Sequence, residues 1–250
     1  MAAQLSSKQI KFIKSLGQKK FRDEYNLFVA EGEKVVEEAL NSKFKIKEIY
    51  KESEIGAECM GRITNLNTPS PILAIVEKPN YSKEEIINQL YQKISEKPDL
   101  LYLGLDTVKD PGNLGTIIRI ADWFGIDAIF AEPGTVEVYN PKVVQATMGA
   151  ILRVRVHYVD NLATLLREAH TAGLNIYGTL LDGNNIYNTE LEPSGIIVMG
   201  NEGRGVSEEC RKELTHKLLI PPYPADAPTS ESLNVAMATG IILAEFRRRQ

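Results

Sequence analysis

The chain of 250 residues has only two cysteines and no long apolar segment. Cys59 and Cys210 lie far apart, which excludes a disulfide framework and gives no spacing typical of a thiolate metal site. The longest apolar stretches fall well short of the ~20 residues that span a bilayer. The first residues, MAAQLSSKQIKF, contain no apolar signal-peptide core. These absences favour a soluble globular protein of the cytoplasm, with neither a membrane nor a metal as partner.

Several common catalytic signatures are also missing. Neither the P-loop pattern G-x-x-x-x-G-K-[ST] nor the dinucleotide fingerprint G-x-G-x-x-G occurs, which argues against phosphate loops of those two types. No G-x-S-x-G elbow supports Ser-His-Asp hydrolysis. The three histidines, His157, His170 and His216, have no ligand spacing and are expected to be structural.

Acidic residues are absent from the first 22 positions, although the whole chain has a formal net charge of −4. A basic end on an acidic body is a local footprint that can hold the phosphates of a nucleic acid. A solvated helix face is the alternative explanation. The candidate RNA contacts are Lys8, Lys11, Lys14, Lys19, Lys20 and Arg22.

Three segments follow one another along the chain. Residues 1–77 predict a small α/β domain, with a helix opening at the capping box Ser6–Gln9. Residues 78–99 are polar and bounded by prolines, and they predict a linker that contains a helix. In residues 100–250, strands and helices alternate, which predicts a mostly parallel sheet with helices on both faces. The strands are expected at 26–32, 45–50, 71–77, 100–105, 128–131, 152–159, 175–181, 195–200 and 217–220, and the later helices at 113–125, 141–149, 161–172, 207–214 and 232–248.

The stretch DPGNLGTIIRIADWFG, residues 110–125, predicts a turn that runs into a helix. Asn113 is a candidate N-cap. Gly115 lies one turn before Arg119, so the guanidinium has room to lean toward the helix start, where free N–H groups favour anions. A surface ion pair with Asp122 explains the arginine equally well.

Two further loops follow expected strands, at the carboxyl ends where ligands bind in such sheets. GNEGRGVS, residues 200–207, places Asn201 and Glu202 among three glycines, which also suits a tight turn. In PPYPADAPTSESLN, Ser230 or Ser232 can cap the next helix, and Asn234 is then either a cap partner or a ligand contact.

The last expected helix is apolar almost all round, which predicts deep burial. Ala236, Gly240 and Ala244 lie four apart and form a groove for close approach of another helix. Core packing and a subunit interface explain this groove equally well.

Together the three motifs resemble the SpoU (TrmH) family of RNA ribose 2′-O-methyltransferases in the SPOUT superfamily. The matching stretches are DPGNLGTIIRIADWFG, IIVMGNEGRGVS and LLIPPYPADAPTSESLNVAMATGIILAEF, and YNPKVVQATMGAILRV resembles the family's middle segment. Residues 6–40 are similar to an L30e-like RNA-binding domain. The third loop departs from the family's Pro-Met-x-Gly pattern, because PPYPADAPTSE stands there.

The resemblance implies a carboxyl-terminal trefoil knot that binds S-adenosyl-L-methionine, and a homodimer with the knot region at its interface. It implies a structured RNA as substrate, with ribosomal RNA ahead of transfer RNA. By matching motif positions, the expected catalytic residues are Arg119, Asn113, Glu202, Ser232 and Asn234. The expected cofactor contacts are Met199, Gly200, Asn201, Gly203, Ile220, Pro221, Ser232, Leu233 and Asn234.

Methyl transfer to a ribose requires the 2′-oxygen to be positioned and polarised. Arg119 as a base would have to be neutral, which is costly for a guanidinium, so a phosphate clamp is the preferred role. Glu202 and Asn113 would orient the arginine or the ribose. A catalytically inactive RNA-binding protein of the same fold is the alternative, and a nucleotide-binding oxidoreductase is disfavoured by the missing fingerprint.

Overall fold

A computed structural model describes residues 5–80, 99–224 and 230–249. The chain forms two compact units, residues 1–80 with 137–153 and residues 81–136 with 154–250. The helix expected within residues 78–99 lies outside the described residues.

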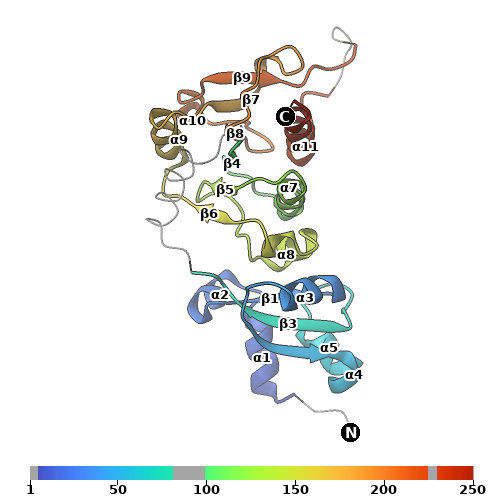
Figure 1. The fold of residues 1–250 in the computed structure, drawn as a ribbon. Helices are drawn as coiled ribbons and strands as arrows, with labels where there is room; N and C mark the ends of the chain where they lie inside the picture. The colour runs from blue at the N-terminus through green and yellow to red at the C-terminus, as the bar shows by residue number, and fades with distance from the viewer. Residues whose placement is uncertain (1–4, 81–98, 225–229, 250) are drawn as a thin grey trace. The chain divides into compact units, whose positions relative to one another are not determined.

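The first unit contains an antiparallel sheet of three strands in the order β1-β3-β2 (Figure 1). All three strands occur where the sequence predicts them, as β1 (Leu27–Glu31), β2 (Ile46–Lys51) and β3 (Ile72–Glu77). Every residue of β1 is buried, as suits the apolar run LFVA, and the buried Glu31 accepts hydrogen bonds from the Thr64 hydroxyl and the Asn65 N–H. The accompanying helices are α1 (Ser7–Ser15), α2 (Lys19–Tyr25), α3 (Glu33–Leu40), α4 (Glu52–Ile55) and α5 (Ala57–Ile63).

Helix α1 begins with the capping box that the sequence predicts. The Ser6 side chain accepts a hydrogen bond from the Gln9 N–H, and the Gln9 side chain accepts one from the Ser6 N–H. Ile10, Ile13 and Leu16 then lie on one face of the helix and are buried in the core. The opposite face carries exposed lysines.

Residues 137–153 pack with this first unit, although the sequence pattern groups them with the later strands. They contain α8 (Pro141–Ala146), which contacts β1, and a 3₁₀ turn at Ala150–Leu152. The helix is shorter than expected, because Met148 and Gly149 both adopt positive φ angles of 52° and 95°. The Tyr139 ring lies 4.7 Å from the ring of Phe28 between centroids.

The second unit contains a six-stranded sheet in the order β6-β5-β4-β8-β7-β9, and all of its pairings are parallel. Figure 1 shows α9 and α10 on one side of the sheet and α7 and α11 on the other. The predicted parallel sheet with helices on both faces is therefore confirmed. Its elements are β4 (Leu101–Leu105), α7 (Pro111–Trp123), β5 (Ala128–Ala131), β6 (Val156–Tyr158), α9 (Leu162–Thr171), β7 (Ile176–Asn185), β8 (Gly195–Met199), α10 (Glu208–Arg211), β9 (His216–Leu219) and α11 (Val235–Arg248).

The strand order reverses between β4 and β8. From β4 the chain proceeds outward through β5 and β6, whereas β8, β7 and β9 extend the sheet in the other direction. The carboxyl ends of adjacent strands at such a reversal open into a crevice where ligands bind. The loops after β4 and β8 therefore meet at one place.

Helix α11 is not buried all round, contrary to the expectation from its composition. One face packs against α7, and a Cβ added to Gly240 would lie 3.6 Å from Ile120 Cδ1 of α7. On the other face Met237 is 61% exposed, and Ala244 is also exposed. An apolar composition alone cannot distinguish a buried helix from one with an uncovered apolar face.

Candidate functional site

The loops after β8 and β9 and the first turn of α7, which follows β4, line one cavity of about 580 Å³ in the second unit. The cavity walls include residues 199–205 after β8, 218–220 at the end of β9, and 231–235 at the start of α11. Asn113, in the first turn of α7, lines the same cavity. Three segments that are far apart in the sequence thus meet here.

Glu202 is the acceptor at the centre of a polar network beside this cavity. Its carboxylate accepts hydrogen bonds from the N–H groups of Asp110 (3.0 Å) and Lys109 (3.2 Å). The Asn113 side chain donates a further hydrogen bond of 3.1 Å. Burial raises the pKa of Glu202, but the hydrogen bonds, that of Asn113 foremost, favour the charged form and bring the pKa below its ordinary value. Glu202 is therefore a carboxylate at neutral pH.

Asn234 joins the third loop to the first. Its Nδ2 donates to the side-chain oxygen of Asn113 at 2.9 Å. Its own side-chain oxygen accepts from the N–H groups of Ala236 and Met237, so Asn234 is the N-cap of α11. The expectation that Ser230 or Ser232 caps this helix is wrong, and Asn234 is both a cap and a side-chain partner.

Asn113 has a different place from the one that the sequence suggests. The N-cap of α7 is Asp110, whose carboxylate accepts from the Asn113 N–H at 2.8 Å, and Pro111 occupies the first turn. Proline suits that position because it has no N–H to satisfy. The cap at Asp110 leaves the Asn113 side chain free to bridge Glu202 and Asn234.

Asn201 connects the loop after β8 to the loop after β4 by a hydrogen bond. Its Nδ2 donates to the carbonyl oxygen of Thr107 at 2.8 Å, and its backbone exchanges two hydrogen bonds of 2.9 Å with Gly205. The loop folds so closely on itself that a Cβ on Gly200 would lie 2.2 Å from the carbonyl carbon of Gly205. Only glycine fits position 200. Thr107, with a φ of 61°, is part of this arrangement, and nothing in the sequence marks it.

Arg119 does not join this network. It is exposed on α7 and does not line the cavity. Arg119 forms no hydrogen bond and no ion pair with any residue in the described part of the chain. The alternative expectation, a surface ion pair with Asp122, is therefore not met. Its guanidinium remains free for an external anion.

The expected cofactor contacts gather around the cavity, with one exception. The lining includes Met199, Gly200, Asn201, Gly203, Ile220, Ser232, Leu233 and Asn234, whereas Pro221 is not among the described lining residues. The apolar wall formed by Leu180, Leu218 and Ile242 is not among the contacts expected from the sequence. Leu180 lies within the strand expected at 175–181, next to its last residue, and this position near the expected carboxyl end is the signal that points to it.

The basic amino-terminal residues divide into two groups. Arg22 is 2% exposed and pairs with Glu137 at 2.6 Å, so the expectation that it contacts RNA does not fit its position. Lys14 donates to the Thr64 carbonyl, and Lys19 pairs with Asp23. The exposed lysines that pair with no acidic residue in the described ranges are Lys8, Lys11 and Lys20.

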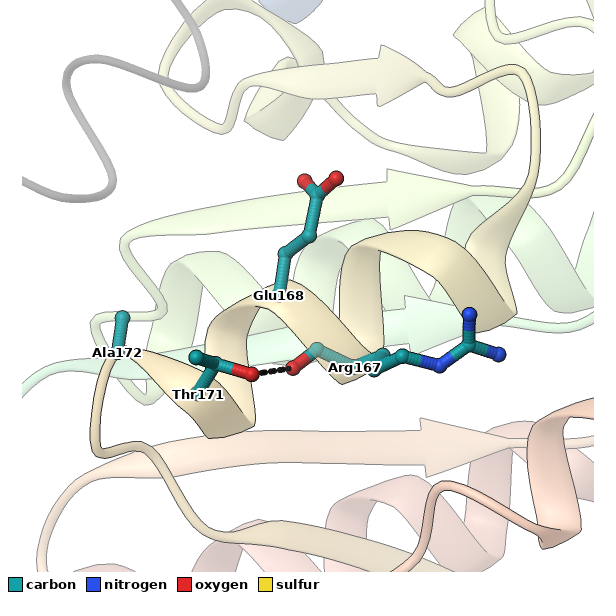
Figure 2. A pocket seen from close by; sticks show the side chains of 4 residues that line it. All are labelled: Arg167, Glu168, Thr171 and Ala172. Carbon is teal, nitrogen blue, oxygen red and sulfur yellow. Dashed lines mark hydrogen bonds between the residues drawn. The ribbon is translucent and has the colours of Figure 1, made fainter.

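A second hollow, of about 370 Å³, lies along α9, and its lining residues do not form a candidate binding site (Figure 2). In Figure 2 the side chains of Arg167 and Glu168 point in different directions, and Thr171 donates only to the Arg167 carbonyl. Arg167 is already paired with Glu213 at 2.6 Å. The described residues of this hollow thus present no converging polar groups.

Two absences hold for the described residues. No group of three His, Cys, Asp or Glu side chains among them is placed to hold a metal ion. None of the helices in residues 5–80, 99–224 and 230–249 is long and apolar enough to cross a membrane.

Comparison with known families and structures decides between the remaining interpretations. The model of the SpoU rRNA methylase family matches residues 100–244, which contain all three loops. The chain belongs to the SpoU rRNA methylase family. This SpoU methylase also matches an MRM3-like substrate binding domain over residues 7–98. The resemblance seen in the three motifs is confirmed, and the chain is a methyltransferase.

Relatives of this SpoU methylase extend over its whole length. It is 32% identical to the 23S rRNA (guanosine(2553)-2′-O)-methyltransferase RlmP of Bacillus subtilis, over 96% of each chain. A putative RNA methyltransferase of the TrmH family from Porphyromonas gingivalis has a similar structure, with a TM-score of 0.85 and 35% identity over 99% of this chain and 100% of that one. An S-adenosylmethionine-bound rRNA methyltransferase from Sinorhizobium meliloti matches with a TM-score of 0.84 and 31% identity, over 99% and 98% of the two chains.

Proposed function

We propose that this SpoU methylase methylates the ribose 2′-hydroxyl of a nucleotide in ribosomal RNA, as a cytoplasmic homodimer that uses S-adenosylmethionine. The observation that carries the proposal is the network of Glu202, Asn113 and Asn234 beside the cavity of about 580 Å³. Three loops supply these side chains, and the same loops carry the family's motifs.

The cavity suits S-adenosylmethionine in size and in chemistry. Cofactor sites typically enclose about 300–1,000 Å³ and combine apolar walls with a few polar groups. Leu180, Leu218 and Ile242 offer an apolar wall for the adenine ring, and the loop at 200–205 offers closely packed backbone groups. Bound S-adenosylmethionine supplies the activated methyl group. We infer that the chain around this cavity forms the trefoil knot that the family resemblance implies.

The polar residues divide the work of binding and polarising the ribose. A carboxylate whose pKa lies below its ordinary value is a weak base, so Glu202 acts by orienting Asn113 and the ribose. Asn113 and Asn234 present amide groups, and Ser232 a hydroxyl, to the same region. Arg119, which stays charged and has no partner in the described residues, clamps an RNA phosphate and stabilises the developing charge on the 2′-oxygen.

The first unit selects the RNA. Its match to a substrate binding domain and its exposed lysines support this role. The similarity to the Bacillus subtilis enzyme, named for 23S rRNA, supports ribosomal RNA ahead of transfer RNA.

Binding and methylation assays separate this proposal from its alternatives. Calorimetry is expected to detect S-adenosylhomocysteine and not NAD, which an oxidoreductase would bind. Unmodified transcripts of 23S rRNA, 16S rRNA and tRNA are then incubated with methyl-labelled S-adenosylmethionine, and nucleosides are analysed by mass spectrometry. A 2′-O-methylnucleoside from an rRNA transcript is the expected product. RNA binding without methylation of any transcript would favour the inactive alternative instead.

A further inference from the structure

Three aromatic side chains form a row on the surface of α1 and α2. The Tyr25 ring meets Phe12 edge-on at 5.2 Å between centroids and lies nearly parallel to Phe21 at 6.3 Å. Tyr25 is 43% exposed, although it sits between two other rings. Phe12 and Phe21 are half-buried, so the row packs partly against the protein and remains partly accessible to solvent.

Lysines stand at both ends of the row. On α1, Lys8 and Lys11 precede Phe12 by four residues and one residue, so Lys8 lies on the same helical face as Phe12. On α2, the Lys20 ammonium lies 5.6 Å from the centre of the Phe21 ring. These three lysines are exposed and pair with no carboxylate in the described residues.

The acidic residues of α2 do not cancel this charge. Asp23 is held by two lysines, Lys19 and Lys78, each at 2.6 Å, and this pairing helps to lower the pKa of Asp23 against the opposing effect of burial. Glu24 is exposed and forms no ion pair with Lys20, whose ammonium lies over the Phe21 ring instead. The surface beside the rings is therefore positive.

We propose that this aromatic row binds an unpaired stretch of the substrate RNA, with Tyr25 stacking on a base and the three lysines contacting the adjacent phosphates. Rings beside cations suit single-stranded RNA, because unstacked bases offer their faces to aromatic side chains. Bases within an RNA duplex are covered by their neighbours and cannot stack in this way. A protein partner fits less well, because lysine is depleted in the cores of protein interfaces. The inference rests on the proposed function, which makes RNA the substrate.

Substitution of Tyr25 in the full chain tests the stacking. The probe is a fluorescein-labelled oligoadenylate, with the oligoadenylate–oligouridylate duplex as comparison, and anisotropy gives the dissociation constants. Tyr25→Leu is expected to weaken binding of the single strand roughly ten-fold, as for other stacked bases, whereas Tyr25→Phe keeps the ring and the affinity. Tyr187→Leu, in the second unit, removes a similarly exposed ring (49%) and is expected to have no effect.

The salt dependence distinguishes stacking from charge. Each phosphate contact contributes about 0.7 to the slope of log K against log salt for a single strand. The double variant Lys8→Gln/Lys11→Gln is expected to lower this slope, whereas Tyr25→Leu weakens binding without changing it. Phe12 is left unchanged because it packs against the core of the first unit. The thermal midpoint of each variant checks that it remains folded.

The outcomes are separable from those of the proposed function. Equal oligoadenylate affinity of wild type and Tyr25→Leu would overturn this inference, as would tighter binding of the duplex than of the single strand. Either result leaves the methyltransferase proposal standing if calorimetry still detects S-adenosylhomocysteine. A folded wild-type chain that binds no S-adenosylhomocysteine would instead contradict the proposed function.

Discussion

Arg119 is exposed on α7, outside the cavity and without a partner in the described residues. Its proposed role as an RNA clamp predicts that Arg119→Ala lowers single-turnover methylation by roughly 10²–10³, the usual effect of removing one donor to a developing negative charge. Arg119→Lys should also lose most activity, because an ammonium lacks the planar fork that matches phosphate.

Two measurements accompany this prediction. The affinity for S-adenosylhomocysteine should stay unchanged, because Arg119 does not line the cavity. Lys212→Ala, which removes another exposed cation of the second unit, should methylate normally. Methylation by Arg119→Ala at the wild-type rate would refute the clamp.

Arg22 has a structural role, although its charge places it among the expected RNA contacts. It donates to the Leu16 carbonyl at 3.0 Å and to Glu137 at 2.6 Å. Removing one partner of a buried pair leaves the other charge uncompensated, which typically costs about 3–5 kcal/mol. Arg22→Ala should therefore lower the free energy of unfolding by roughly 3 kcal/mol in urea denaturation. Lys11→Ala, at an exposed position of α1, should change it by less than about 0.5 kcal/mol. Equal stability of the two variants would contradict this account.

The ion pair of Arg22 and Glu137 could not be predicted from the sequence. Arg22 and Glu137 are 115 residues apart, and no local pattern links them. By contrast, the convergence of Glu202 and Asn234 followed from a general rule, since both stand after strands of one parallel sheet. The N-cap at Asp110 was missed because Asp110 and Asn113 are both good capping residues, and only Pro111 distinguishes them.

Among the secondary-structure elements, α11 is stabilised at its carboxyl end by the ion pairs of Glu245 with Arg248 and Arg249. Hydrogen bonds from Arg248 foremost, and then from Arg249, lower the pKa of Glu245 to about 2, although burial opposes them. Arg249 in turn donates to the carbonyl oxygens of Ile186 and Tyr187 after β7, at 3.0 and 3.1 Å. Glu245 thus orients the arginine that holds the helix end against the sheet.

Glu245→Gln should lower the free energy of unfolding by about 1–2 kcal/mol at neutral pH, because hydrogen bonds to a charged group are lost. Since the pKa is lowered in the folded state, this contribution is fully present above the ordinary value of 4.5 and is lost as the pH falls toward about 2. Urea denaturation at several pH values measures the difference. Glu208→Gln, whose side chain is 83% exposed, should have little effect at any pH. A difference that stays constant down to low pH would count against the pairing.

At the level of elements, periodicity and alternation sufficed to predict most helices and strands. The order of the strands could not be predicted, because alternation does not say on which edge each new strand is added. The exposed face of α11 also escaped prediction, since Met237 and Phe246 are equally apolar in the sequence, yet one is 61% and the other 2% exposed.

For the whole molecule, the exposed apolar face of α11 supports the proposed homodimer. Met237 is 61% exposed there, and Trp123, at the end of the adjacent α7, is 85% exposed. Met237→Glu should place a charge in the interface and shift sedimentation at micromolar concentration toward a monomer of 27.8 kDa. Leu40→Glu, at a 58% exposed site of the first unit, is the matched control. Wild-type protein that sediments as a monomer would refute the homodimer. Gly240 is a poorer test, because a larger side chain would press on Ile120 of α7.

The grouping of residues 137–153 with the first unit predicts what happens when that unit is removed. These residues contact β1 through α8, and Glu137 and Arg153 pair with Arg22 and Glu38. A fragment of residues 99–250 loses all of these partners, so the segment should become accessible to protease although it remains protected in the full chain. Because the segment contributes no residue to the cavity, the folded fragment should still bind S-adenosylhomocysteine, within roughly three-fold of the full-chain affinity on the additivity expected of separate sites. Limited proteolysis with mass spectrometry, followed by calorimetry, gives both readings. Equal protection of residues 137–153 in the fragment and in the full chain would show that the first unit does not hold them in place, and a lost affinity would show that the cavity depends on it.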